Sequence, residues 1–127
     1  MQVCGLLELL AKIDSDYTVR RLEEMISIPS VVGEEEAMAE YLSAELDSLG
    51  FKCDLEEVEP KRFNIYARMK GERNGRRLMF NGHTDTVPVC EGWITDPFKP
   101  TRKDGLMYGL GSCDMKGGFA CALTALK

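Results

Sequence analysis

The sequence has one histidine, His83, among its 127 residues, and its five cysteines form no Cys-x-x-Cys pair. Any histidine chemistry therefore has a single place in the chain. The cysteines are odd in number and scattered, which argues against a disulfide framework and against a zinc site built from thiolates. Free thiols are typical of a reducing compartment, so we expect a cytoplasmic protein.

Long apolar runs are also missing. No stretch approaches the roughly 18 residues that a membrane helix needs, and the chain does not open with a charged segment followed by an apolar one. We therefore expect neither export nor a membrane partner. The sequence has no internal repeat and no low-complexity linker, and its 44% hydrophobic and 29% charged residues are typical of one globular domain.

The formal net charge is -5, with acidic residues gathered at positions 34–36 and 56–59. Nucleic acid is therefore not expected as a partner, because a phosphate backbone requires a basic face. Basic residues cluster at positions 70–77, where Gly71 and Gly75 interrupt them. This pattern favours a hairpin turn over the alternative, a phosphate-binding site.

Apolar periodicity predicts three helices in the first half of the chain. The first covers residues 6–13, and the second is capped by Asp16, carries apolar residues at helical spacing from Val19 to Ile26 and ends before Pro29. The third covers residues 34–49, with glutamates in its first turn and Gly50 as its stop. These helices are expected to pack on strands that follow.

Strand-like segments are predicted at residues 51–58, 63–69 and 76–81, and the last two are expected to pair as an antiparallel hairpin around the 71–75 turn. A second turn at residues 103–105 precedes another short strand at 106–108. A final helix begins near Phe119 and is still running at Lys127. This order indicates an α/β or α+β layered fold, cut at Lys127.

The lone histidine follows the apolar segment 78–80 in the motif Gly-His-Thr-Asp-Thr-Val-Pro. In an extended chain His83 and Asp85 point to the same side, so the Asp85 carboxylate can orient the imidazole, as is common for metal-bound histidines. The alternative is a single polar histidine in a turn before Pro88. The spacing by itself leaves both interpretations open.

A second cluster, Tyr-Gly-Leu-Gly-Ser-Cys-Asp-Met-Lys-Gly-Gly at residues 108–118, surrounds Asp114 with glycines that permit a sharp turn. It fits neither a dinucleotide fingerprint, since Asp114 stands at the third glycine, nor a P-loop, since no hydroxyl follows Lys116 and the glycines. A nucleophilic Cys113 would need a histidine base, so we expect Cys113 to serve packing, with reactivity as the alternative.

Together the two clusters resemble the dinuclear zinc hydrolases that include acetylornithine deacetylase, succinyl-diaminopimelate desuccinylase, aminoacylases and glutamate carboxypeptidases. The Gly-Trp-Ile-Thr-Asp-Pro-Phe segment at residues 92–98 and the Ile-Pro-Ser at 28–30 fit the same pattern. The resemblance implies an α/β fold in which residues 1–127 form the N-terminal portion of a three-layer catalytic domain, a mixed sheet flanked by helices. The rest of that domain and the lid or dimerisation domain would lie beyond Lys127.

The resemblance also implies roles for the motif residues. His83 would ligate one metal ion, Asp114 would bridge two, and Asp85 would be the catalytic residue that orients His83. The peptide bond between Asp114 and Met115 would be cis. The cofactor would be two divalent ions, zinc by preference, although cobalt or manganese also suits carboxylate-rich sites. Leu110, where many members carry arginine, is most similar to the acetylornithine deacetylase branch.

The implied reaction is hydrolysis of an amide in an N-acyl amino acid or small peptide, with a glutamate beyond Lys127 moving the proton of a metal-bound water. Members are often homodimers. Because the chain supplies two metal ligands, we expect the 127 residues to be inactive alone. A chain that ends within a helix would leave an apolar face and a sheet edge uncovered, so we also expect self-association. The alternative from another class is a non-catalytic relic or protein-binding module that uses the helix at residues 34–45. The coding sequence after Lys127 would discriminate between the two.

Overall fold

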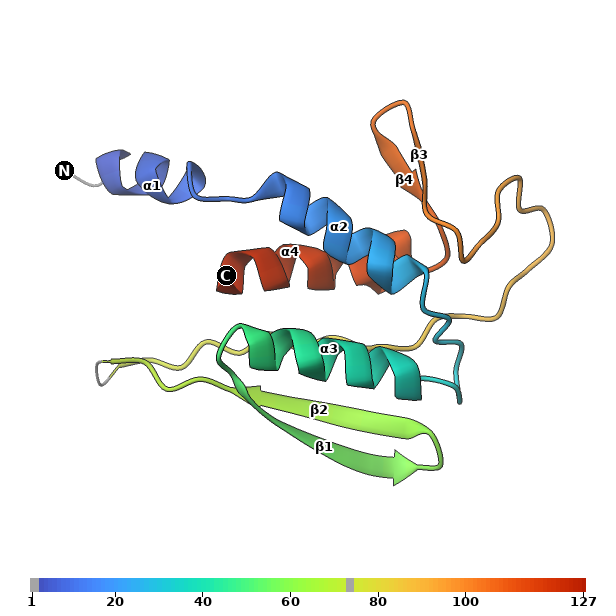
Figure 1. Ribbon diagram of the computed structural model, residues 1–127, viewed down its shortest axis with the longest axis horizontal. Helices are drawn as coiled ribbons and strands as arrows, with labels where there is room; N and C mark the ends of the chain where they lie inside the picture. Colours follow the sequence, from blue (N-terminus) through green and yellow to red (C-terminus); the bar gives the residue numbers. More distant parts are fainter. Residues whose placement is uncertain (1–2, 73–74) are drawn as a thin grey trace.

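The computed structural model describes residues 3–72 and 75–127, in which helices and strands form a mixed α/β arrangement (Figure 1). The elements follow one another as α1 Val3–Leu10, α2 Ser15–Ile26, α3 Glu36–Ser48, β1 Lys52–Glu59, β2 Arg62–Arg68, β3 Thr101–Lys103, β4 Leu106–Tyr108, an irregular turn Ser112–Lys116 and α4 Gly117–Leu126. Among these residues no helix is long and apolar enough to cross a membrane.

The predicted helices are present, but the first is Val3–Leu10 and not residues 6–13, and the start of α2 also differs. Its N-terminal cap is Asp14 and not Asp16, because the Asp14 carboxylate accepts a hydrogen bond from the Tyr17 amide at 2.9 Å. Asp16 lies inside the first turn, where a negative charge complements the helix dipole. The third helix ends at Ser48, and Gly50 follows with a φ of 88° that favours glycine.

Helices α2, α3 and α4 share one apolar core. Helix α2 packs along α4, and α3 packs on a face of the β1–β2 hairpin (Figure 1). Burial of a Leu or Met side chain contributes about 1.5–3 kcal/mol relative to an exposed one. The core consists of two buried residues from each helix, namely Tyr17, Met25, Met38, Leu42, Ala120 and Leu123.

The strands β1 and β2 pair with each other in antiparallel register, from Lys52 opposite Arg68 to Glu59 opposite Arg62. The predicted pairing of residues 63–69 with 76–81 is therefore wrong in the part of the chain described, and residues 76–81 form no strand there. The short Pro60–Lys61 connection folds β2 directly back on β1, with Lys61 at a φ of 64°. Residues 73 and 74, in the predicted turn, lie outside the described residues.

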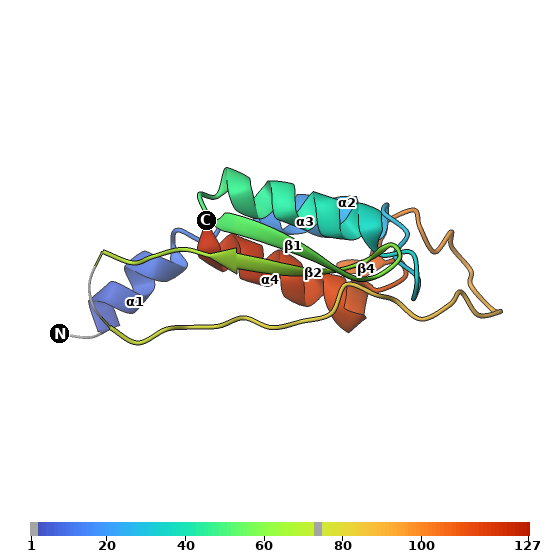
Figure 2. The same ribbon diagram turned by 90° about the horizontal axis from the view of Figure 1, so that it is seen from below.

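Residues 75–81 instead run as an extended segment apart from β2 (Figure 2). An extended segment becomes a strand only where a neighbour takes its backbone hydrogen bonds. The side chains of Leu78 and Met79 are each 81% exposed, and Phe80 is 53% exposed. The segment leads into the loop that carries His83.

The second predicted turn is confirmed. Strands β3 and β4 pair around Asp104 and Gly105, whose φ values of 53° and 78° suit a tight hairpin turn. A single parallel bridge joins Val31 to Thr86. This bridge attaches the loop after α2 to the segment that carries His83.

Candidate metal centre

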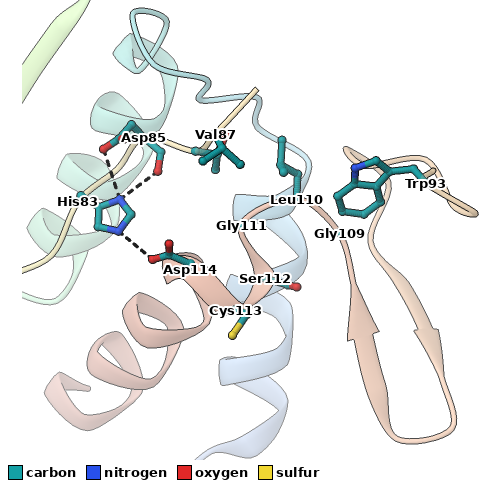
Figure 3. A pocket seen from close by; sticks show the side chains of 11 residues that line it. His83, Asp85, Val87, Trp93, Gly109, Leu110, Gly111, Ser112, Cys113 and Asp114 are labelled. Carbon is teal, nitrogen blue, oxygen red and sulfur yellow. Dashed lines mark hydrogen bonds and ion pairs between the residues drawn. The ribbon is translucent and has the colours of Figure 1, made fainter. Parts of the chain in front are cut away.

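The two glycine-rich clusters meet at His83 and Asp114. The Nε2 atom of His83 lies 2.9 Å from Oδ1 of Asp114, although 31 positions separate the residues (Figure 3). His83 lies in the loop after residues 75–81, and Asp114 lies in the turn that precedes α4. The structure thus brings together two of the residues that the sequence singles out.

The other ring nitrogen faces Asp85. His83 Nδ1 lies 3.0 Å from the main-chain carbonyl oxygen of Asp85 and 3.3 Å from its carboxylate Oδ1 (Figure 3). Since a carbonyl only accepts, Nδ1 is the donor of this hydrogen bond. The sequence pattern pointed to the carboxylate of Asp85, and the structure adds the main-chain carbonyl as the nearer partner. Nε2 is left to face Asp114.

The electrostatics of the site favour a charged imidazole. The hydrogen bond to the Asp114 carboxylate raises the pKa of His83 above its ordinary value, and Asp85 acts in the same direction through its carbonyl and its charge. Partial desolvation opposes these effects. The His83 side chain is 45% exposed, so solvent screens the pair.

A pocket of about 310 Å³ opens beside these residues. His83, Asp85 and Asp114 lie on one side of it, and Trp93 lies on the other, with Leu110 between (Figure 3). The site therefore places polar groups against an apolar wall, which is typical of small-molecule sites. Cys113, expected to be packed, is instead exposed and lines the pocket.

The turn that presents Asp114 depends on its glycines. Gly111 has a φ of 79°, and a Cβ atom on Gly117 would lie 2.5 Å from the Ser112 carbonyl oxygen. The peptide bond between Asp114 and Met115 is cis, which confirms the expectation from the family resemblance. Residues with larger side chains at these glycines would displace the carboxylate.

Close packing holds the two clusters against each other. A Cβ atom on Gly82 would lie 2.7 Å from the Met115 Cε atom, and the Met115 sulfur accepts a hydrogen bond from the His83 amide at 3.3 Å. A Cβ atom on Gly109 would lie 2.4 Å from Cγ2 of the buried Ile26. The glycines thus allow both clusters to approach their neighbours.

Sequence reasoning missed Lys116. Its side chain is buried, at 3% exposure, and its Nζ donates to the main-chain carbonyls of Met25 and Ile28, both at 2.8 Å. Burial lowers the pKa of Lys116 to about 8. The sequence does show a lysine two positions after Asp114. Its position there only counts against a P-loop and does not indicate a buried side chain.

The donor atoms present fit part of a zinc site. An imidazole nitrogen and a carboxylate oxygen are ordinary zinc ligands, and a second ring nitrogen that donates to a carbonyl is the usual arrangement of a metal-bound histidine. Residues 3–72 and 75–127 contain no group of three or more His, Cys, Asp and Glu side chains suited to a metal ion. A catalytic zinc takes three protein ligands, so these residues supply an incomplete set.

Comparison with known proteins places this site in a family. The family model described as "Peptidase family M20/M25/M40" matches residues 79–127, which carry both clusters. The chain is 40% identical to a succinyl-diaminopimelate desuccinylase of Delftia acidovorans over 116 residues, 87% of this chain and 30% of the relative. It is 45% identical to an acetylornithine deacetylase of Vibrio vulnificus over 102 residues, 80% of this chain and 26% of the relative.

A solved structure agrees with the fold. The crystal structure of human carnosine dipeptidase 1 superposes with a TM-score of 0.79 at 25% sequence identity, covering 94% of this chain and 30% of that one. The predicted α/β class is therefore confirmed, and the chain spans about 30% of the length of the proteins it matches. The motif clusters, the sequence relatives and the fold agree: residues 79–127 match peptidase family M20/M25/M40, and most of the chain is similar to the N-terminal third of its relatives.

Proposed function

We propose that residues 1–127 are the N-terminal part of the catalytic domain of a metal-dependent amide hydrolase. The reaction is removal of the acyl group from an N-acyl amino acid, as in acetylornithine deacetylase, or cleavage of a small peptide. The observation that carries this proposal is the 2.9 Å approach of His83 Nε2 to Asp114 Oδ1. Relatives named for deacetylation and for desuccinylation, both of which are deacylations, support the same reaction class.

In this proposal His83 and Asp114 are the residues that would hold the metal centre, as its imidazole and carboxylate ligands. Zinc there would supply a Lewis acid for the amide carbonyl and would lower the pKa of the attacking water to about 7. With metal bound, His83 would be neutral, and Asp85 would keep the proton on Nδ1, so that Nε2 presents its lone pair to the centre. Cobalt or manganese would suit the same donors.

The pocket beside the centre is the proposed place for the substrate. Leu110 and Trp93 provide apolar surface, while the polar groups lie opposite them (Figure 3). Leucine at position 110 supports an acetylornithine deacetylase-like substrate, an N-acyl amino acid with a free carboxylate. The relatives of this chain include succinyl-diaminopimelate desuccinylases as well, so the acyl group is the part of the proposal to be tested first.

The direct test uses the complete reading frame that contains these residues. Its product, loaded with zinc, is assayed on N-acetylornithine, N-succinyl-diaminopimelate and a dipeptide. We expect hydrolysis of one of them that is lost on chelation and lost in His83→Ala and Asp114→Asn. Asp85→Asn should lower metal affinity or activity by about 10–100-fold. Asp104→Asn is the matched control, because Asp104 is exposed in the β3–β4 turn and asparagine tolerates its positive φ.

Residues 1–127 alone should be inactive, because they provide two of the ligands that a catalytic zinc requires. Zinc-dependent hydrolysis of N-acetylornithine by the purified 127-residue chain, abolished by His83→Ala, would contradict this. An adjacent glutamate pair and a later histidine in frame after Lys127 support the enzyme. A stop codon directly after Lys127 would favour the alternative, a relic or binding module acting through α3.

A further inference from the structure

Lys116 is a buried cation whose contacts are unusual. Transferring an ammonium group from water into a protein interior is costly unless the charge is compensated. Among the described residues, the hydrogen-bond partners of its Nζ are two main-chain carbonyl oxygens, those of Met25 and Ile28. Met25 lies in the last turn of α2 and Ile28 lies two positions past its end, where the helix dipole favours a positive charge. The ammonium therefore fits its position without a carboxylate.

The same stretch of chain also holds the segment of His83. The amide of Thr86 donates to the Ser30 carbonyl at 2.7 Å, and the amide of Val32 donates to the Thr86 carbonyl at 3.1 Å. Thr86 is buried at 3% exposure and lies three positions after His83. Residues 25–32 are thus attached to both halves of the metal centre, to one through Thr86 and to the other through Lys116.

Lys116 and Asp114 lie in the same short and tightly packed turn. Its amide donates to the Gly111 carbonyl at 2.9 Å, and a Cβ atom on Gly111 would lie 3.1 Å from its Cδ atom. Met115, between the two residues, contacts Gly82 and the His83 amide instead. Lys116 and Met115 therefore fix the Asp114 turn from two sides, one against the end of α2 and the other against the His83 segment.

We propose that Lys116 is a positioning residue: by binding the carbonyls at the end of α2, it holds the Asp114 carboxylate within reach of His83. Lys116 touches no reacting group, and it acts through the turn of which it is part. The role does not depend on metal or on the hydrolytic activity proposed above. It concerns the spacing of two side chains and can be tested in the 127-residue chain.

The single histidine provides the reporter. In a long-range proton–nitrogen correlation spectrum every imidazole signal belongs to His83, and its Nε2 shift responds to the hydrogen bond with Asp114. Spectra of the metal-free chain are recorded at one fixed pH for wild type, Asp114→Asn and Lys116→Met. We expect the Nε2 signal of Lys116→Met to move from the wild-type position to that of Asp114→Asn. The Nδ1 signal, set by Asp85, should move less.

Lys61→Met is the matched control, since Lys61 pairs with Glu34 on the surface at 2.7 Å and lies outside the metal centre. Its His83 signals should coincide with those of wild type. Circular dichroism shows whether each variant is folded. A folded Lys116→Met with wild-type His83 signals would overturn the proposal, since a merely structural lysine would leave the His83–Asp114 bond intact.

A measurement on the wild-type chain covers the case in which Lys116→Met does not fold. Urea is raised in small steps while the His83 Nε2 signal and the exchange of the Lys116 Nζ protons are followed together. The proposal expects both to change at the same urea concentration. Loss of the His83–Asp114 signal while the Lys116 protons remain protected would overturn it.

Discussion

Arg21 of α2 forms an ion pair with Glu45 of α3 and also binds Glu24 on its own helix at 3.0 Å. Glu45 accepts a second hydrogen bond from the Tyr17 hydroxyl, and Tyr41 of α3 donates to Glu24 at 2.7 Å. Two glutamates therefore join α2 to α3 beside the apolar core. The Arg21 and Glu45 side chains are 19% and 13% exposed, so the pair is largely shielded from water.

Replacing Glu45 with glutamine should lower the free energy of unfolding by about 1–3 kcal/mol, because the shielded Arg21 guanidinium loses one of its two charged partners. Urea denaturation measures the change. Glu34→Gln is the control, since the Glu34–Lys61 pair is exposed and should contribute at most about 1 kcal/mol. Equal effects of the two substitutions would show that burial of the Arg21–Glu45 pair has no energetic consequence.

The raised pKa of Tyr17 predicts that the folded chain loses stability at alkaline pH. Burial, and then the hydrogen bond to Glu45, raise the pKa of Tyr17 to about 12 from its ordinary value of 10.0. Because the folded pKa is the higher one, the stabilisation is complete below pH 10.0 and is lost as the pH rises towards about 12. Its size is on the order of 3 kcal/mol.

The measurement is the free energy of unfolding against pH for wild type and Tyr17→Phe. Between pH 10.0 and about 12 the free energy of unfolding should fall more steeply for wild type than for Tyr17→Phe. The difference in this free energy between the two proteins should therefore become smaller as the pH rises. Burial also raises the pKa of Tyr41, so some slope persists in the variant. Parallel curves would contradict the assignment to Tyr17.

Gly109→Ala should destabilise the chain by about 1–3 kcal/mol, because its methyl group would meet Ile26 Cγ2 at 2.4 Å and Ile26 is fully buried. In the background of Ile26→Ala the same substitution should cost less, since the clashing atom is gone. Thermal unfolding of the double-mutant cycle gives the coupling energy. A coupling near zero would argue against direct contact. Gly5→Ala, with no atom within 4 Å of the added Cβ, is the control.

The exposed apolar segment 78–80 should make the isolated chain self-associate, since an extended segment without a partner strand is a template for pairing with another chain. Sedimentation should show a weight-average mass that rises with concentration. Met79→Lys should reduce this rise, because Met79 is 81% exposed and lies within the segment. Ile94→Lys places the same charge on another side chain, one that is 92% exposed. Equal effects of both variants would indicate a general charge effect.

The residues of the candidate metal centre stand out in the sequence because each lies in a short local motif. His83, Asp85 and Asp114 are marked by residue type and by flanking glycines, and the structure places them together. Lys116 could not be assigned in the same way. Its partners are main-chain carbonyls 88 and 91 positions away, and a carbonyl leaves no trace in residue identity.

The fold, too, could be predicted from the sequence only where a feature depends on neighbouring residues. Helices α2 and α3 follow from apolar periodicity, whereas the choice between Asp14 and Asp16 as the cap depends on where the first turn of α2 begins. The strands at residues 51–58 and 63–69 were recognisable, but their pairing depends on which segments meet. The Pro60–Lys61 connection decides it, because it returns β2 to β1 before the later segment is reached.

Attachment of Thr86 and Lys116 to residues 25–32 has a consequence for motion. Since both halves of the candidate centre are hydrogen-bonded to the same piece of chain, we expect a displacement of the end of α2 to move His83 and Asp114 together. The position of the centre within the molecule then changes while the spacing of its two donor atoms is preserved. The end of α2 thus supports both residues of the site.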